Sequence, residues 1–355
     1  MQPQECSVSK TNNFDLLRLL FAGAVLLVHA KELSGFSELA WITQVLSSAV
    51  AVKAFFIVSG FLVFMSYERS ATLRAYAEKR FRRIYPAYFA VIALSAIFLI
   101  CASTGSPEAY FSSEWLKYLL ANLTFLNFIQ PTLPGVFEQN RMPAVNGALW
   151  TLKIEVLFYC VVPLFVWAFR KFGTLLVLVI GYLSSIAYGA FFTGLAESTE
   201  LNIYAEIARQ LPGQLAYFLS GAVLYYFMPA FKCRHKWLLV AAVLTLCVGS
   251  VAPIRLLEPI ALATIVIFCA LFLPASNASK YGDFSYGIYI LHFPVIQLLL
   301  QFNAFRDNPY YFLPFAILLT GLGAAASWHF LEKRFLTLKP EILLTKPGNA
   351  AYVHH

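Results

Sequence analysis

The feature that most constrains this chain is the recurrence of apolar runs that are long enough to cross a membrane. A helix needs about 20 apolar residues to span about 30 Å of hydrocarbon. The chain is 60% hydrophobic and 12% charged, with a mean hydropathy of +0.69, which is far from the composition of a water-soluble protein. We therefore predict an all-α, polytopic membrane protein with about ten transmembrane helices. The predicted spans are 14–33, 45–66, 86–103, 148–168, 173–193, 210–229, 237–252, 256–274, 285–303 and 310–331.

An eleventh run, at 115–130, is shorter and amphipathic. Leu116, Leu120 and Leu123 recur at helical spacing, whereas Lys117 and Asn122 interrupt the apolar surface. We interpret this segment as a short interfacial or re-entrant helix rather than a span.

The distribution of positive charge supports ten spans. With the N-terminus in the cytoplasm, the predicted inside loops hold 17 of the 26 Lys and Arg residues, the outside loops hold 6, and 3 lie within spans. Cytoplasmic loops carry such an excess of positive residues, and an even number of spans places both termini inside. The net charge of +8 is therefore mostly a signal of topology and requires no nucleic-acid partner.

The six cysteines show no paired spacing and most lie in predicted spans, so they indicate neither disulfides nor a metal site. No soluble domain or repeat is evident. We expect one transmembrane domain over residues 1–340 and a cytoplasmic tail over 341–355.

Two ionisable residues stand out in the first span, because such side chains are costly in hydrocarbon. His29 follows Arg18 by eleven positions, so a helix presents both on one side, about 16 Å apart along its axis. Arg18 lies near the predicted cytoplasmic end. The simpler alternatives are an interfacial anchor for Arg18 and a neutral core histidine for His29.

The second and third spans add further polar residues. Lys53 lies near the outer end of the second span, and Ser59 and Gly60 lie deeper, where small residues allow a ligand or another helix to approach closely. The inside loop that follows carries a dense basic cluster before Pro86, where we expect the third span to begin. The cluster consists of Lys79, Arg80, Arg82 and Arg83. Guanidinium groups suit phosphate, although basic juxtamembrane runs also serve as topology signals.

Glu155 lies about two turns into the predicted span 148–168, at a predicted depth similar to that of His29. A carboxylate there is harder to explain by structure alone than a histidine. Tyr289 and His292 lie about two turns into the ninth span, in a run that reads YGIYILHFP.

The order and spacing of these features resemble one family, the integral-membrane acyltransferase family 3. The resemblance rests on an Arg and a His separated by ten residues (Arg18, His29), on an Arg-x-x-Arg (Arg80, Arg83), and on the runs FFIVSGFL, LWTLKIEVLFY and SYGIYILHFP. It covers about 13–335. Lys153, two residues before Glu155, departs from the family pattern. The resemblance also implies that any extracytoplasmic partner domain, present in some larger members, would come from another protein.

Members of this family transfer acyl groups, usually acetyl from acetyl-CoA, to hydroxyls of bacterial surface carbohydrates. The resemblance implies a protein of the bacterial inner membrane that binds acyl-CoA, a carbohydrate or lipid-linked glycan acceptor, and membrane lipid. It further implies that Arg80 and Arg83, with Arg82 and Arg18, hold the CoA phosphates, and that the pantetheine arm passes Ser59 and Gly60. Tyr289 and His292 are expected to border the same donor path.

His29 has the chemistry to remove a proton from a sugar hydroxyl, with Glu155 fixing its tautomer, or to accept the acyl group itself. We expect Lys53, Trp115 and Trp150 to contact the acceptor, although aromatic residues at an interface can be anchors. The acyl group is acetyl or larger, such as succinyl. The rival interpretations are a transporter that uses His29 and Glu155 as a proton relay, and a non-catalytic sensor of the acyl donor.

Overall fold

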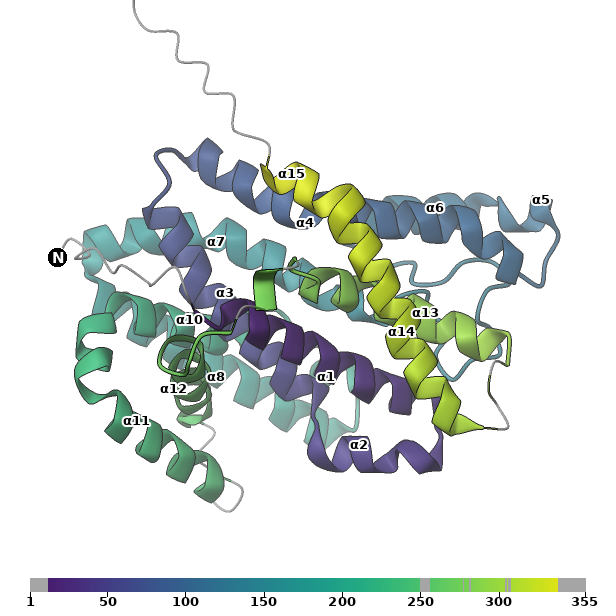
Figure 1. Ribbon diagram of the computed structural model, residues 1–355. Coiled ribbons are helices and arrows are strands. Elements are labelled where there is room, and N and C mark those ends of the chain that lie inside the picture. The colour runs from purple at the N-terminus through teal and green to yellow at the C-terminus, as the bar shows by residue number, and fades with distance from the viewer. Residues whose placement is uncertain are drawn as a thin grey trace, which may run out of the picture.

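The computed structural model describes residues 12–249, 256–276, 278–280, 282–303, 305 and 308–337, and this part of the chain contains helices and no strand (Figure 1). Ten long helices in it correspond one by one to the ten predicted spans. They are α1 (Phe14–Ser34), α3 (Ser48–Glu68), α4 (Leu73–Phe98), α7 (Trp150–Phe172), α8 (Thr174–Thr199), α10 (Leu211–Tyr226), α11 (Met228–Val248), α12 (Glu258–Leu271), α13 (Ser285–Gln301) and α14 (Pro309–Ser327). The protein is an all-α polytopic membrane protein. The predicted tail, 341–355, lies outside the described residues.

Within the described residues, five helical segments are long and apolar enough to cross a membrane by themselves. They are Ser37–Glu68, Leu73–Ala102, Gly147–Phe172, Thr174–Thr199 and Pro309–Thr337. The other long helices are either shorter, as α12 is, or carry several charges, as α1 and α11 do. Charged residues in a helix that packs among other helices are tolerated when they face protein or a cavity.

The ends of the helices alternate between two faces of the molecule. We call one the arginine face, because it holds Arg18, Arg80, Arg82 and Arg83. Contacts there join the starts of α1, α4 and α13 to one another and to the ends of α3, α7, α10 and α12. These contacts are Arg83 to Asp283, Arg18 to Asp283, the Asn13 N–H to the Ala270 carbonyl, Arg80 to Ser66, and Glu68 to both Tyr226 and Arg170. Alternation over ten helices agrees with the predicted topology, in which the first and last spans begin and end on one face.

The start of the third span differs from the prediction. Helix α4 begins at Leu73, where the Thr72 hydroxyl accepts a hydrogen bond from the Ala75 N–H, and Pro86 lies inside the helix. The basic cluster therefore lies on a helix and not in a loop. Lys and Arg have high helix propensity, and Glu78 pairs with Arg82 one turn later. As a result, Arg80 and Arg83 project from neighbouring positions on one helix face.

The segment predicted to be interfacial contains the short helix α6 (Ser113–Leu123). Its eleven residues extend about 16 Å, which is too short to cross a membrane. It packs beside α4, where the Tyr88 hydroxyl donates to the Asn122 carbonyl at 2.7 Å. The remaining short helices are α2 (Ala40–Val45), α5 (Pro107–Tyr110), α9 (Asn202–Ala208) and α15 (Lys333–Thr337), and a π-helical turn, Trp328–Glu332, joins α14 to α15.

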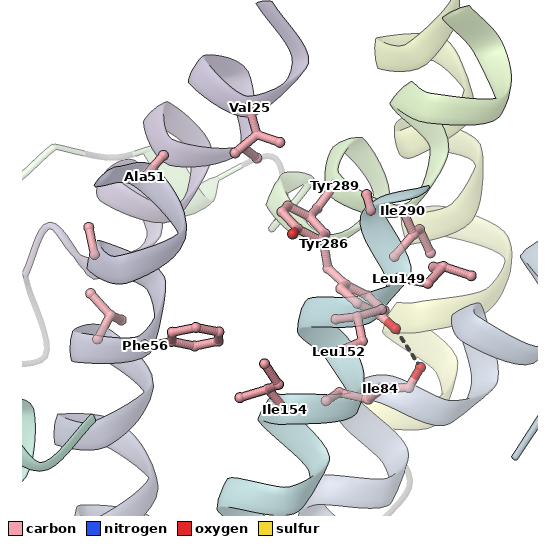
Figure 2. Packing of buried hydrophobic residues seen from close by; sticks show 14 of the residues in the cluster. Val25, Ala51, Phe56, Ile84, Leu149, Leu152, Ile154, Tyr286, Tyr289 and Ile290 are labelled. Atoms are coloured by element: carbon pink, nitrogen blue, oxygen red, sulfur yellow. Dashed lines mark hydrogen bonds between the residues drawn. The ribbon is translucent and has the colours of Figure 1, made fainter. Parts of the chain in front are cut away.

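Helices α1, α3, α4, α7 and α13 surround the centre of the molecule (Figure 1). Figure 2 shows how closely α4, α7 and α13 approach there, with the Tyr286 hydroxyl donating to the Ile84 carbonyl at 2.8 Å. On the other side, α3 packs tightly against α10. A β-carbon at Gly60 would collide with the Phe218 carbonyl, and one at Gly221 would collide with the Ile57 carbonyl.

Candidate active site

A cavity of about 550 Å³ opens among α3, α4, α7 and α13. Its lining changes character along its length. Arg18, Lys79, Arg80, Arg82 and Arg83 line the part at the arginine face. Ser59 and Glu155 line the middle, and Phe55, Thr151 and Tyr289 line the part nearest the centre of the molecule. The cavity therefore leads from a cationic mouth to an interior lined by apolar side chains, several hydroxyl groups and one carboxylate.

Asp283 organises the cationic mouth. Its Oδ2 lies 2.5 Å from Arg83 Nη2 and 3.2 Å from Arg18 Nη2, so one carboxylate holds two guanidinium groups from different helices. Asp283 itself is fixed by the Ser285 hydroxyl, which donates to its Oδ1 at 2.5 Å. Burial alone would raise the pKa of Asp283, but the guanidinium groups of Arg83 and Arg18 dominate and hold it well below its usual range. This carboxyl group is therefore charged at neutral pH.

Arg80 has a different environment. It donates to the Ser66 hydroxyl at 3.2 Å and lies over the Tyr159 ring at 5.6 Å, and no carboxylate of the described residues pairs with it. The Nε atoms of Arg18 and Arg80 are buried without a hydrogen-bond partner among the described groups. Because a buried donor without a partner costs free energy, these two atoms fit a site that binds an anion.

Glu155 lies midway along the cavity and is held by two hydroxyl groups. Ser59 donates to Glu155 Oε1 at 3.1 Å and Tyr159 donates to the same oxygen at 2.5 Å. Tyr159 lies one turn after Glu155 on α7, whereas Ser59 comes from α3. The carboxylate is thus fixed beside the cavity at the point where α3 meets α7.

His29 pairs with His292. Its Nδ1 lies 2.8 Å from His292 Nε2, and the rings stack with centroids 5.1 Å apart. His292 is fully buried and its Nδ1 lies 3.1 Å from the Ile288 carbonyl, to which only an N–H can donate. His292 Nε2 then carries a lone pair and accepts from His29 Nδ1–H. This leaves the lone pair of His29 on Nε2, the tautomer that a general base needs.

The pairing predicted for His29 is therefore wrong, because the partner of His29 is His292 and the partners of Glu155 are Ser59 and Tyr159. Glu155 and His29 also differ in depth. Glu155 lies one turn nearer the arginine face than Thr151, which contacts Tyr289, whereas His292 lies one turn beyond Tyr289 on the other side. His29 is partly accessible and does not line the cavity. Tyr289 lines the cavity, packs against Phe55 with ring centroids 5.6 Å apart, and contacts the ring of His292 at a centroid distance of 5.9 Å.

Two residues that were predicted to contact the acyl donor, Gly60 and His292, do not line the cavity. Gly60 does not line the cavity; it packs on the backbone of α10, as a small residue at a helix crossing does. His292 lies behind Tyr289 and not on the cavity. The remaining predicted donor residues, Arg18, Ser59, Arg80, Arg82, Arg83 and Tyr289, all line it.

None of the three predicted acceptor residues lines the cavity or contacts the ring of His29 or His292. Lys53 is engaged by Glu258 at 2.7 Å and lies over the Tyr217 ring. Trp115 donates to the Ala96 carbonyl at 2.7 Å, which fixes α6 to α4. Trp150, at the start of α7, does not line the cavity. In the structure these residues contact other helices or lie apart from the site.

Sequence reasoning missed Asp283, Tyr159 and Thr151. Asp283 is an acidic residue just before a predicted span, on the face where the basic cluster lies. An acidic residue on the same face as a basic cluster is a signal in the sequence that could have predicted an ion pair. Tyr159 is visible as a hydroxyl one turn from Glu155. Thr151, whose Oγ1 lies 2.6 Å from the Tyr289 hydroxyl, gives no such signal.

Comparison with known proteins decides which family this arrangement belongs to. The profile of a family described as "Acyltransferase domain" matches residues 11–331, nearly the whole chain. The chain belongs to this family. It is thus a member of the integral-membrane acyltransferase family 3, in agreement with the resemblance of its motifs, and the family supports a membrane O-acyltransferase that uses an acyl donor.

Several relatives of this acyltransferase extend over similar lengths. Nodulation protein 10 of Rhizobium leguminosarum bv. viciae is 26% identical over 96% of this chain and 97% of its own. The O-acetyl transferase of Shigella phage Sf6 is also 26% identical, over 92% of this chain and 97% of its own. The peptidoglycan O-acetyltransferase OatA of Listeria monocytogenes is 24% identical over 80% of this chain and half of its own. No solved structure matches the chain.

Proposed function

We propose that this acyltransferase moves an acyl group, acetyl in the simplest case, from cytoplasmic acyl-CoA to a hydroxyl of a surface or exported carbohydrate. The observation that carries the proposal is the cavity that begins among arginines and ends at Tyr289, whose ring contacts His292 of the histidine pair. Acyl-CoA carries phosphates at one end and its thioester at the other, so it would lie with its phosphates among the arginines and its thioester toward the histidines. The O-acetyl transferase names of two relatives support the reaction type.

The arginine face would be cytoplasmic, since acyl-CoA is made there and the positive residues gather there. Arg80 and Arg82 would hold phosphate oxygens at the mouth of the cavity, joined by the unpartnered Nε of Arg18. Arg83 would act with Asp283 to fix Arg18. The pantetheine arm would lie along Ser59 and Glu155 toward Tyr289. Arg18 and His29 lie about 16 Å apart along α1, so an extended arm bridges the two ends of the site.

His29 Nε2 would take the proton from the acceptor hydroxyl as its oxygen attacks the thioester carbonyl. The new C–O bond forms, the C–S bond breaks, and the CoA thiolate leaves and takes up the proton. His292 would hold the imidazole of His29 through its Nε2 and share the charge of the imidazolium. The same geometry permits acyl transfer to His29 Nε2 first, followed by transfer to the hydroxyl.

The direct test is CoA release from acetyl-CoA by purified protein in proteoliposomes, with a glycan extract of the host as acceptor and His29→Ala as the inactive variant. Release that depends on both glycan and His29 supports the proposal. Binding of acetyl-CoA without any release, under all acceptor conditions, would contradict it. A transporter that uses His29 as a proton relay would then account better for the site.

A further inference from the structure

A second cavity, of about 500 Å³, opens at the other end of α1 and α13. These two helices run side by side in the same direction, because Arg18 meets Asp283 near their starts and His29 meets His292 further along. The second cavity is lined by Leu33 and Ser34 from α1, Leu300 and Gln301 from α13, and residues 139–141 of the loop that precedes α7. It therefore opens on the face opposite to the arginine face.

The lining of this cavity is rich in amide groups. Gln301 donates through Nε2 to the Ala102 carbonyl at 3.2 Å, but its Oε1 is buried without a hydrogen-bond partner among the described groups. Asn140 donates through Nδ2 to the carbonyl and the Oε1 of Gln297, at 3.1 and 2.9 Å, which leaves its own amide oxygen as an acceptor. Because a buried acceptor without a donor is costly, Gln301 fits a site that receives a ligand O–H.

Arg141 supplies hydrogen-bond donors to the same cavity. Its guanidinium group lies against Gly35, which ends α1 in the left-handed conformation with a φ of 70°. A β-carbon at position 35 would collide with this guanidinium, so the glycine makes room for it. No carboxylate of the described residues pairs with Arg141. Phe36 adds an aromatic ring to the lining.

The pair of histidines lies between the two cavities. Leu33 follows His29 by one turn, about 6 Å along α1, and Gln301 follows His292 by nine residues, about 13 Å along α13. A ligand in the second cavity would thus approach His29 from the side opposite to the arginines. Separate approaches for two substrates are what a transfer across the membrane requires.

We propose that the second cavity is the binding site for the carbohydrate acceptor. Sugar hydroxyls both donate and accept, so they complement the amide oxygens of Gln301 and Asn140 and the N–H groups of Arg141. An aromatic ring beside such groups suits the apolar face of a sugar. This inference rests on the proposed function, and it names the residues that hold the acceptor before its hydroxyl reaches His29.

The test measures the concentrations of glycan extract and of acetyl-CoA that give half-maximal CoA release in proteoliposomes. We expect Gln301→Met and Arg141→Gln each to raise the half-saturating glycan concentration about tenfold, with the half-saturating acetyl-CoA concentration within twofold of wild type. Arg209→Gln is the matched control. Arg209 lies on the same face, exposed and paired with Glu206, outside both cavities, so this variant should leave both values unchanged.

Unchanged glycan saturation in Gln301→Met and Arg141→Gln, in a wild type that transfers acetyl groups, would overturn the acceptor site and leave the proposed function standing. Equal shifts for glycan and acetyl-CoA would overturn it too, since they would indicate a general loss of structure. Absence of glycan-dependent release in the wild type would contradict the proposed function itself. Thermal midpoints of the purified variants identify any that fail to fold.

Discussion

At the scale of single residues, the site depends on polar groups that hold one another in place. His292 fixes the tautomer of His29, Asp283 fixes two arginines, and two hydroxyls fix Glu155. Each of these partners, except Tyr159, comes from a different segment of the chain than the group it fixes. In a membrane interior such partners are important, because unsatisfied polar groups are more costly there than in water.

The role of His292 as a positioning residue is testable with two amide substitutions. A glutamine places its carbonyl near the position of the imidazole Nε2 and still accepts from His29 Nδ1–H. An asparagine mimics Nδ1 instead and leaves His29 without an acceptor. We therefore expect His292→Gln to retain at least tenfold more turnover than His292→Asn, with similar acetyl-CoA affinity. Equal activities of the two variants would contradict the tautomer assigned to His29, and the pH profile of turnover should shift only in His292→Asn.

The ionisation of Asp283 makes the stability of the folded protein depend on pH. Its pKa is lowered in the folded protein, so its stabilising contribution is fully present above the ordinary carboxyl pKa of about 3.9 and is lost as pH falls toward the lowered value. We expect the thermal midpoint of purified protein to change little through this group between pH 8 and 5, and to fall below pH 4. Asp283→Asn leaves Arg18 and Arg83 without their carboxylate, which we expect to lower the free energy of unfolding by about 3 kcal/mol or more.

The matched control for this prediction is Glu114→Gln. Glu114 pairs with Lys117 on the exposed surface of α6, where a salt bridge contributes little. A thermal midpoint of Asp283→Asn equal to that of Glu114→Gln would show that Asp283 does not hold the arginines in the way that the structure indicates.

At the scale of helices, glycines allow particular segments to pack closely against one another. Gly60 and Gly221 bring α3 and α10 into backbone contact, and Gly35 ends α1 so that Arg141 can lie over it. Other glycines, such as Gly23 and Gly189, have open space around them. The same residue type therefore has different importance at different positions.

We expect Gly60→Ala to lower the thermal midpoint of the purified protein clearly, because its methyl group would collide with the Phe218 carbonyl and force α3 and α10 apart. Gly23→Ala is the control. A methyl group there meets nothing within 4 Å, and alanine favours a helix by about 0.5–1 kcal/mol, so the variant should be as stable as wild type or more stable. A thermal midpoint of Gly60→Ala equal to that of wild type would contradict the tight crossing of α3 and α10.

The helices themselves were largely predictable from sequence, because apolar runs of about 20 residues have few alternatives in a membrane. The start of α4 was not, since a basic stretch is typical of both a cytoplasmic loop and an amphipathic helix. The partner of His29 was not predictable either. Sequence gives the position of each residue along its own helix. The offset and the rotation of that helix relative to its neighbours depend on packing, for example of the Phe293 ring against the His29 ring, with centroids 5.7 Å apart.

At the scale of the whole molecule, two cavities lie on opposite faces and a pair of histidines lies between them. This arrangement suits a protein that receives one substrate from each side of a membrane. Two native cysteines provide a test of the orientation. Cys101 lies at the end of the α4 segment on the face opposite to the arginines, and Cys233 lies near the start of α11, and both are exposed.

We expect a membrane-impermeant maleimide to label Cys101 in intact spheroplasts, and to label Cys233 only after the membrane is opened. Versions that retain only one of the two cysteines assign the label, and the version that lacks all six cysteines gives the background. Labelling of Cys233 in intact spheroplasts, without labelling of Cys101, would invert the topology and place the arginine face outside the cytoplasm.

The roles of the histidine pair and of the arginine face are tested together by glycan-dependent CoA release by wild type, His29→Ala and Arg83→Ala in proteoliposomes. We expect His29→Ala to lose about 10²–10⁴-fold in turnover while still binding acetyl-CoA, because the substitution removes the proposed base. Arg83→Ala should chiefly raise the acetyl-CoA concentration needed for half-maximal release, because it loosens the cationic mouth of the cavity. Full turnover in His29→Ala, or an Arg83→Ala variant with unchanged acetyl-CoA saturation, would contradict the path from the arginine face to the histidines.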